Sequence, residues 1–95
     1  MLINTATFPN QDTYKGPYKN LKRNGKGTYT FANEKGTYVG EYVDNKRHGL
    51  GVATYADRST YNGNWRSNKR HGHGVYTYAN GDKYCGGWVN GARGK

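Results

Sequence analysis

Residues 61–82 read YNGNWRSNKRHGHGVYTYANGD, and this stretch is one copy of a unit that recurs along the chain. The copy before it reads YVGEYVDNKRHGLGVATYAD at residues 38–57, and the first copy reads YKGPYKNLKRNGKGTYTFAN at residues 14–33. A half copy, YCGGWVNG, follows at residues 84–91. The leading tyrosines stand at positions 14, 38, 61 and 84, at intervals of 24, 23 and 23 residues. A fixed period of this length predicts stacked supersecondary units.

Each full unit predicts two β-strands, because its apolar residues and glycines recur with a period of two. We expect the rings of one strand to cover the glycines of its neighbour, so the Gly-x-Gly pair serves packing and is not a dinucleotide-binding fingerprint. The predicted fold is all-β, an elongated single-layer antiparallel meander of tandem β-hairpins. In the third unit the shared face is expected to carry Tyr61, Gly63, Trp65, Gly72, Gly74, Tyr76 and Tyr78.

Two kinds of turn are expected to alternate along the meander. One kind lies around Lys22-Arg23 and at residues 44–47 and 67–70; the other contains Asn33-Glu34, Asp57-Arg58 and Asn80-Gly81. The extra residue of the first unit falls in the second kind of turn, at residues 33–36. We therefore divide the chain into an N-terminal tail or partial cap at residues 1–13 and an array at residues 14–95. The array consists of units 14–37, 38–60 and 61–83 and a half repeat at 84–95.

The composition fits a thin sheet better than a domain with a conventional core. Only 33% of the 95 residues are hydrophobic, whereas 15% are aromatic and 15 residues are glycine. Cys85 is the single cysteine, which excludes an intrachain disulfide and a cysteine-based zinc site. No apolar run approaches the ~20 residues of a membrane span, and the N-terminus lacks a signal-peptide pattern. We expect a cytoplasmic protein, either free or peripheral at a membrane or the cytoskeleton.

The two ends of the array carry distinct signals. Pro17 lies inside the first predicted strand, where it removes a backbone donor and predicts a sheet edge. Residues 84–90 form a first strand without a second, which leaves an open edge at the C-terminal end. Either another chain pairs there, which would give a homo-oligomer, or the sequence is an excerpt of a longer array.

The pattern Tyr-x-Gly-x-Trp, Lys-Arg-His-Gly-x-Gly and Tyr-x-Tyr-Ala-Asn-Gly-Asp, at a period of 23 residues, resembles the MORN (membrane occupation and recognition nexus) repeat. Residues 61–83 resemble it most; residues 38–60 carry Tyr42 in place of the usual tryptophan, and residues 14–37 carry Pro17 and an added residue. The resemblance implies a sheet of successive hairpins with a non-catalytic role. MORN arrays occur in junctional membrane proteins, phosphatidylinositol-phosphate kinases, a lysine methyltransferase and cytoskeletal scaffolds. Their proposed partners are acidic phospholipids and other proteins.

The basic residues suggest a lipid-binding edge. The chain carries 15 Lys and Arg against 6 Asp and Glu, which favours anionic partners. With strands ~4.8 Å apart, a pair of basic residues in each unit should form a row that steps by ~10 Å along one edge. The alternative is that these are ordinary solvated turn residues. The candidate lipid-binding residues are Lys22, Arg23, Lys46, Arg47, Lys69 and Arg70.

Protein–protein recognition along the sheet is the first functional expectation. A one-layer sheet leaves a face that needs cover, and the second unit carries an apolar patch from Val39 to Val52 on the face opposite the rings. Two alternatives are peripheral binding of acidic phospholipids and a regulatory role within a larger enzyme, such as a phosphatidylinositol-phosphate kinase. The candidate aromatic residues for packing or protein binding are Tyr38, Tyr42, Tyr55, Tyr61, Trp65, Tyr76, Tyr78, Tyr84 and Trp88.

Other chemistries find little support in the residues. His48 and His71 recur at one register that Asn24 occupies in the first unit, which favours a hydrogen-bonding role over a metal site. Nucleic-acid binding is not expected, because stacking on bases needs exposed rings and most rings here should cover glycines. We expect no cofactor and no enzyme activity, because the sequence offers no catalytic constellation and a flat sheet offers no deep pocket.

Overall fold

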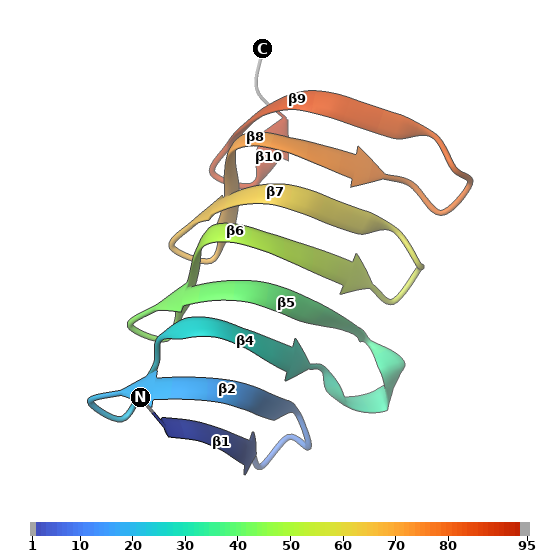
Figure 1. Ribbon diagram of the computed structural model, residues 1–95. Coiled ribbons are helices and arrows are strands. Elements are labelled where there is room, and N and C mark those ends of the chain that lie inside the picture. The colour runs from blue at the N-terminus through green and yellow to red at the C-terminus, as the bar shows by residue number, and fades with distance from the viewer. Residues whose placement is uncertain (1, 94–95) are drawn as a thin grey trace.

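The computed structural model describes residues 2–93, which form one antiparallel sheet whose strands follow one another in chain order (Figure 1). Each hairpin lies beside the next, and the two ends of the chain lie at opposite ends of the sheet (Figure 1). The molecule measures 38 × 26 × 17 Å along its principal axes, and the shortest dimension fits a single sheet with side chains on both faces. The predicted all-β, single-layer meander is confirmed. Its strands are β1 (Leu2–Thr7), β2 (Thr13–Lys19), β3 (Lys22–Arg23), β4 (Gly25–Thr30), β5 (Gly36–Val43), β6 (Lys46–Tyr55), β7 (Thr60–Arg66), β8 (Lys69–Thr77), β9 (Lys83–Val89) and β10 (Ala92–Arg93).

The N-terminal residues are part of the sheet and not a tail. β1 pairs with β2 along its whole length, from Leu2 opposite Tyr18 to Thr7 opposite Thr13. The turn that follows is closed by hydrogen bonds from the Phe8 N–H to the Asp12 oxygen (2.9 Å) and from the Gln11 N–H to the Phe8 oxygen (2.8 Å). The same pair of bonds closes the turns at residues 55–59 and 78–82. Residues 2–13 are therefore the second half of a unit, and the predicted boundary at residue 14 falls inside a hairpin.

The turns at one edge of the sheet contain two residues each. These turn residues all have positive φ angles, as the type I′ turns of tight hairpins require. Leu21 differs from the other turn residues, which are Gly, Asn, Asp or Ser. It adopts a φ of 65°, and its side chain is 96% exposed. The Lys-Arg pairs that we placed in these turns are instead the first residues of the returning strands. The turns are Asn20-Leu21, Asp44-Asn45, Ser67-Asn68 and Asn90-Gly91.

We expect Leu21→Gly to stabilise the protein by about 1 kcal/mol, because glycine adopts positive φ without the steric cost that leucine bears. Gly91 occupies the same place in the last turn, with a φ of 89°. The matched variant Gly91→Leu should therefore be destabilised by a similar amount. Urea unfolding followed by circular dichroism measures both changes. If Leu21→Gly were less stable than the wild type, the leucine would not be strained at its positive φ.

A bulge interrupts the second strand of the second and third units just after the basic pair. In the second unit Tyr42 pairs with Arg47 and Gly40 pairs with Gly51, so three residues on β6 lie opposite one residue on β5. Gly49 lies inside this bulge with a φ of 93°. The two glycines of Gly-x-Gly therefore have different roles, since only the second packs under a ring. The first supplies the positive φ of the bulge.

Pro17 does not mark an edge strand, which corrects our prediction. β2 pairs with β1 on one side and with β3 and β4 on the other. The oxygen of Pro17 accepts a hydrogen bond from the Asn24 N–H (3.2 Å), so the backbone of Pro17 faces the bulge between β3 and β4. In antiparallel strands the N–H and C=O of one residue point to the same neighbour. The donor that proline lacks would therefore point into the bulge, where the regular ladder is interrupted.

The opposite edge of the sheet carries longer turns that side-chain oxygens close. The Oδ1 atoms of Asn10, Asp57 and Asn80 each accept a hydrogen bond from the backbone N–H two residues later, at 2.9–3.0 Å. The first full unit carries a short 3₁₀ turn, Ala32–Glu34, and its closing bond runs from the Phe31 N–H to the Gly36 oxygen (2.9 Å). This turn is one residue longer than the equivalent turn between Tyr55 and Ser59, which confirms the predicted site of the extra residue.

The core is a row of tyrosine rings, each lying over two glycines. A Cβ atom on Gly74 would lie within 2.5 Å of the Tyr61 ring, and one on Gly63 would lie 2.9 Å from the Tyr61 hydroxyl. Each leading tyrosine also donates its hydroxyl hydrogen to the backbone oxygen three residues later, at 2.9–3.1 Å. These bonds satisfy the buried hydroxyls and fix each ring above its own strand. The fully buried leading tyrosines are Tyr14, Tyr38 and Tyr61.

Candidate functional site

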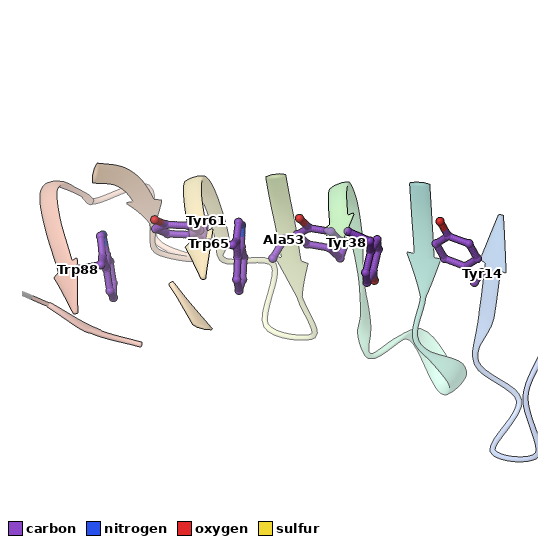
Figure 2. Close-up of a cluster of buried hydrophobic side chains, with 7 residues drawn as sticks. Tyr14, Tyr38, Ala53, Tyr61, Trp65 and Trp88 are labelled. Atoms are coloured by element: carbon purple, nitrogen blue, oxygen red, sulfur yellow. The ribbon is translucent and has the colours of Figure 1, made fainter. Parts of the chain in front are cut away.

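Aromatic rings cover one face of the sheet. Figure 2 shows Tyr14, Tyr38, Tyr61, Trp65 and Trp88 in one row that crosses the strands. Neighbouring rings meet edge to face, with centroids 5.2–5.5 Å apart and interplanar angles of 81–88°. This geometry is the favoured one for aromatic pairs, and it lets flat rings form a core one side chain deep.

Arginine side chains hold successive hairpins together on this aromatic face. The guanidinium of Arg47 lies 4.7 Å from the Trp65 ring centroid, and that of Arg70 lies 4.6 Å from the Trp88 ring centroid. Arg47 also donates from Nη2 to the backbone oxygen of Asn68 (2.9 Å), in the turn of the next hairpin. Asn68 in turn accepts the Arg47 backbone N–H with its Oδ1 atom (2.9 Å). Arg23 makes the same two bonds to Asn45. Each arginine therefore joins one unit to the next.

The lysines of the basic pairs lie on the other face. Lys22, Lys46 and Lys69 are exposed and pair across the turns with Lys19, Val43 and Arg66 respectively. The six residues that we expected to form one basic row are thus divided between two faces. Because the arginines bind the turns of the next hairpin, the exposed positive row consists of lysines and Arg66. Arg70 and Tyr76 have the same parity along the strand. The alternation of side chains between the two faces therefore already predicts that the arginine lies on the aromatic face.

We expect Arg47→Gln to destabilise the protein by about 2 kcal/mol, because it removes a stacked cation and the bond to the next turn. The matched variant Lys46→Gln should change the stability by less than about 0.5 kcal/mol, since its side chain is exposed. Thermal unfolding of both variants measures the difference. Equal stabilities for the two variants would show that the arginine contributes no more than a surface charge.

The aromatic residues predicted for packing or binding form two groups, one buried and one that reaches the surface. Tyr38, Tyr42, Tyr61, Trp65 and Trp88 are buried, at 0–5% exposure, so these rings form the core. The others reach the surface: Tyr55, Tyr76 and Tyr84 are partly buried, and Tyr78 is 38% exposed.

Burial raises the pKa values of the core tyrosines. Desolvation raises the pKa of Tyr42 to about 12, and the neighbouring guanidiniums of Arg23 and Arg47 oppose this rise. Burial raises the pKa values of Tyr14, Tyr38, Tyr55 and Tyr61 in the same way. The aromatic face therefore consists of neutral phenols between fixed positive charges.

The face opposite the rings carries the predicted apolar patch. Val39 and Val52 pair across β5 and β6 and are 40% and 37% exposed, and Leu50 beside them is 61% exposed. A hollow of about 390 Å³ lies among these three side chains, with Lys26 and Glu41 at its rim. The Glu41 carboxylate accepts the Leu50 backbone N–H (2.8 Å) and so fixes the position of this residue in the bulge.

The recurring histidines contact the turns of the next hairpin. The Nδ1 atom of His48 accepts the Ser67 N–H at 3.4 Å, and that of His71 accepts the Asn90 N–H at 3.5 Å. No group of three or more His, Cys, Asp or Glu side chains within the described residues is arranged to hold a metal ion.

The comparison with known families agrees with this geometry. The family model of the MORN repeat matches residues 14–35, 38–60, 61–83 and 84–94, which together cover most of the chain. The chain belongs to the MORN repeat family. Its MORN units begin at the leading tyrosines, and each of the three full units contains the tyrosine, the two covered glycines and the arginine described above. A search of curated proteins finds no match to the chain. The described residues include no helix of the length and apolarity that crossing a bilayer requires.

Proposed function

We propose that this MORN sheet is a non-catalytic scaffold that binds a protein partner on the Val39–Leu50–Val52 patch. The observation that supports this site is the exposure of three apolar side chains around one hollow, on a face without a second layer. A partner segment with apolar side chains flanked by acidic ones would fit, because Lys26 lines the hollow and Lys46 lies farther along the same face. We further propose that the protein acts in the cytoplasm.

The third unit supplies a matched variant for the test. Asn62 stands at the place of Val39 and His73 at the place of Leu50, as the strand registers show. The variant Val39→Asn/Leu50→His therefore gives the second unit a surface that the fold already accepts. We would capture partners from a cell extract with the wild type, with this variant and with Lys46→Gln, under cross-linking. A partner that the wild type and Lys46→Gln retain, and that the double variant loses, would support the site. Equal capture by all three would refute it.

A second candidate function is peripheral binding of acidic phospholipids, and the exposed lysines favour it. Lys19, Lys22, Lys46, Arg66 and Lys69 lie beside the two-residue turns on the face opposite the rings, and Leu21 projects from the first turn. Each such charge near an anionic leaflet contributes roughly 1 kcal/mol. Co-sedimentation with phosphoinositide vesicles at physiological salt tests this function. Lys22→Gln/Lys46→Gln/Lys69→Gln should abolish binding and preserve the fold, and retained binding would exclude the lysine row.

A further inference from the structure

The second unit departs from the MORN pattern at the place where a hollow opens on the aromatic face. Tyr42 stands where the third unit carries Trp65 and the half repeat carries Trp88, and the first unit has Tyr18 at the same place. Beside Tyr42 lies a hollow of about 200 Å³. It is lined by Arg23, Tyr29, Phe31, Tyr42, Asn45, Arg47 and Asn68. A phenol is smaller than an indole, so this substitution leaves space between two successive arginines.

The hollow offers several unused hydrogen-bond donors. Arg23 and Arg47 each use Nη2 to bind a turn oxygen, and the Arg23 side chain also contacts the Tyr29 hydroxyl. A guanidinium has five N–H donors, so each arginine keeps further N–H groups. The Nε atom of Arg23 is buried and has no hydrogen-bond partner within residues 2–93. The Tyr42 hydroxyl likewise makes no hydrogen bond to a described residue. The side-chain amides of Asn45 and Asn68 accept bonds with their oxygens, so their NH₂ groups remain available.

Among the described side chains, no carboxylate pairs with these donors. Within the described residues neither guanidinium forms an ion pair with a carboxylate. Asp12, which contacts the lining residue Tyr29, accepts the Tyr29 hydroxyl (2.8 Å) and the Ala32 N–H (2.7 Å). These bonds, the backbone bond foremost, keep the pKa of Asp12 below its usual value. Asp12 thus stays ionised behind Tyr29 and does not line the hollow.

We propose that the Arg23–Tyr42–Arg47 hollow binds an oxyanion, carried either by a phosphate monoester or by a carboxylate. Guanidiniums are suited to both groups, because their planar forks donate pairs of parallel hydrogen bonds. The aromatic walls formed by Tyr29 and Phe31, whose ring centroids lie 4.9 Å apart, suit an anion attached to an aromatic ring. The hollow lies on the opposite face from the Val39 patch, so anion binding and partner binding succeed or fail separately.

The test titrates the full chain with three probes: inorganic phosphate, phenyl phosphate and phenylacetate. Nuclear magnetic resonance follows the side-chain amides of Asn45 and Asn68 and the Arg Nε–H signals. We expect phenyl phosphate or phenylacetate to bind at least about tenfold more tightly than inorganic phosphate, because only these probes contact the aromatic walls. Preference for phenyl phosphate assigns the site to phosphate monoesters, and preference for phenylacetate assigns it to carboxylates.

Three variants test whether the probes bind in the hollow. Tyr42→Trp fills the hollow with the residue that the later units carry, so it should fold normally and lose at least about tenfold in affinity. Arg47→Lys keeps the charge but removes the fork, and it should also weaken binding. Arg70→Lys loses an equivalent stacked guanidinium away from the hollow and should bind like the wild type. Absence of binding to the wild type at millimolar probe, or equal binding by Tyr42→Trp, would overturn the proposal.

Discussion

Gly40→Ala should lower the free energy of unfolding by about 3 kcal/mol and the melting temperature by more than about 10 °C. A Cβ atom at this position would lie 2.7 Å from the Leu50 backbone oxygen and in the space of the Gly51 Cα atom and the Tyr38 hydroxyl. Backbone atoms of a paired strand cannot move aside without breaking the ladder. Relief would therefore require β5 and β6 to separate and the Tyr38 ring to leave its place.

Gly87 provides the control for this prediction. It also lies inside a strand, but a Cβ atom there would have no heavy atom within 4 Å. Gly87→Ala should therefore be neutral, or stabilising by up to about 1 kcal/mol through the loss of freedom in the unfolded chain. Urea and thermal unfolding of the two variants measure the difference. Equal losses of stability in the two variants would show that the close contacts of Gly40 with the ring and the backbone do not stabilise the sheet.

Alkaline pH should unfold the protein cooperatively. Burial raises the pKa of Tyr42 to about 12 from its usual value of 10.0. The unfolded chain therefore loses the phenolic proton first, so stability is fully present below pH 10 and falls as the pH rises toward about 12. While a tyrosine is ionised only in the unfolded chain, it lowers the free energy of unfolding by about 1.4 kcal/mol per pH unit. Burial also raises the pKa values of Tyr14, Tyr38, Tyr55 and Tyr61, and these tyrosines steepen the fall.

Urea unfolding at a series of pH values from 8 to 11.5 tests this sign and slope. In Tyr42→Phe, the decline above pH 10 should be shallower by about 1.4 kcal/mol per pH unit, because one linked proton is gone. Tyrosinate absorbance followed alongside circular dichroism provides the second readout. Full ionisation of the tyrosines near pH 10 with an intact sheet would show that the rings are not buried as described.

The repeat unit predicted most of this fold because its pattern is chemically direct. Tyr61 and Gly63 alternate with a period of two on one strand, and Gly74 and Tyr76 do so on the next. Only a sheet puts a ring over glycines on both strands. The role of the first glycine of each pair was predicted wrongly, because Gly49 and Gly72 have the parity of the covered glycines but lie in bulges with positive φ. Parity alone does not distinguish a bulge from a regular strand.

Three other features were missed for different physical reasons. β1 lacks the Gly-x-Gly signal, yet residues 6–14, ATFPNQDTY, align with residues 53–61, ATYADRSTY, and this match would have revealed the strand. The arginines were placed in turns because the two-residue turns come earlier, at Asp44-Asn45 and Ser67-Asn68. The hollow beside Tyr42 was not predicted either. Its signal was the tyrosine that replaces a tryptophan, which gains a meaning only once Arg23 and Arg47 are seen on either side.

The strict agreement between strand order and chain order has a mechanical consequence. Apart from the two-residue strand β3, which pairs with β2 beside β4, every strand pairs only with its neighbours in the chain, and the two ends lie at opposite ends of the sheet (Figure 1). A load applied between the ends is carried from hairpin to hairpin, and each hairpin can peel away without first disrupting a distant one. The hydrogen bonds that join this hairpin to the sheet then break one after another. The sheet would extend in steps of one hairpin, each step releasing a ring from its glycines and an arginine from the next turn.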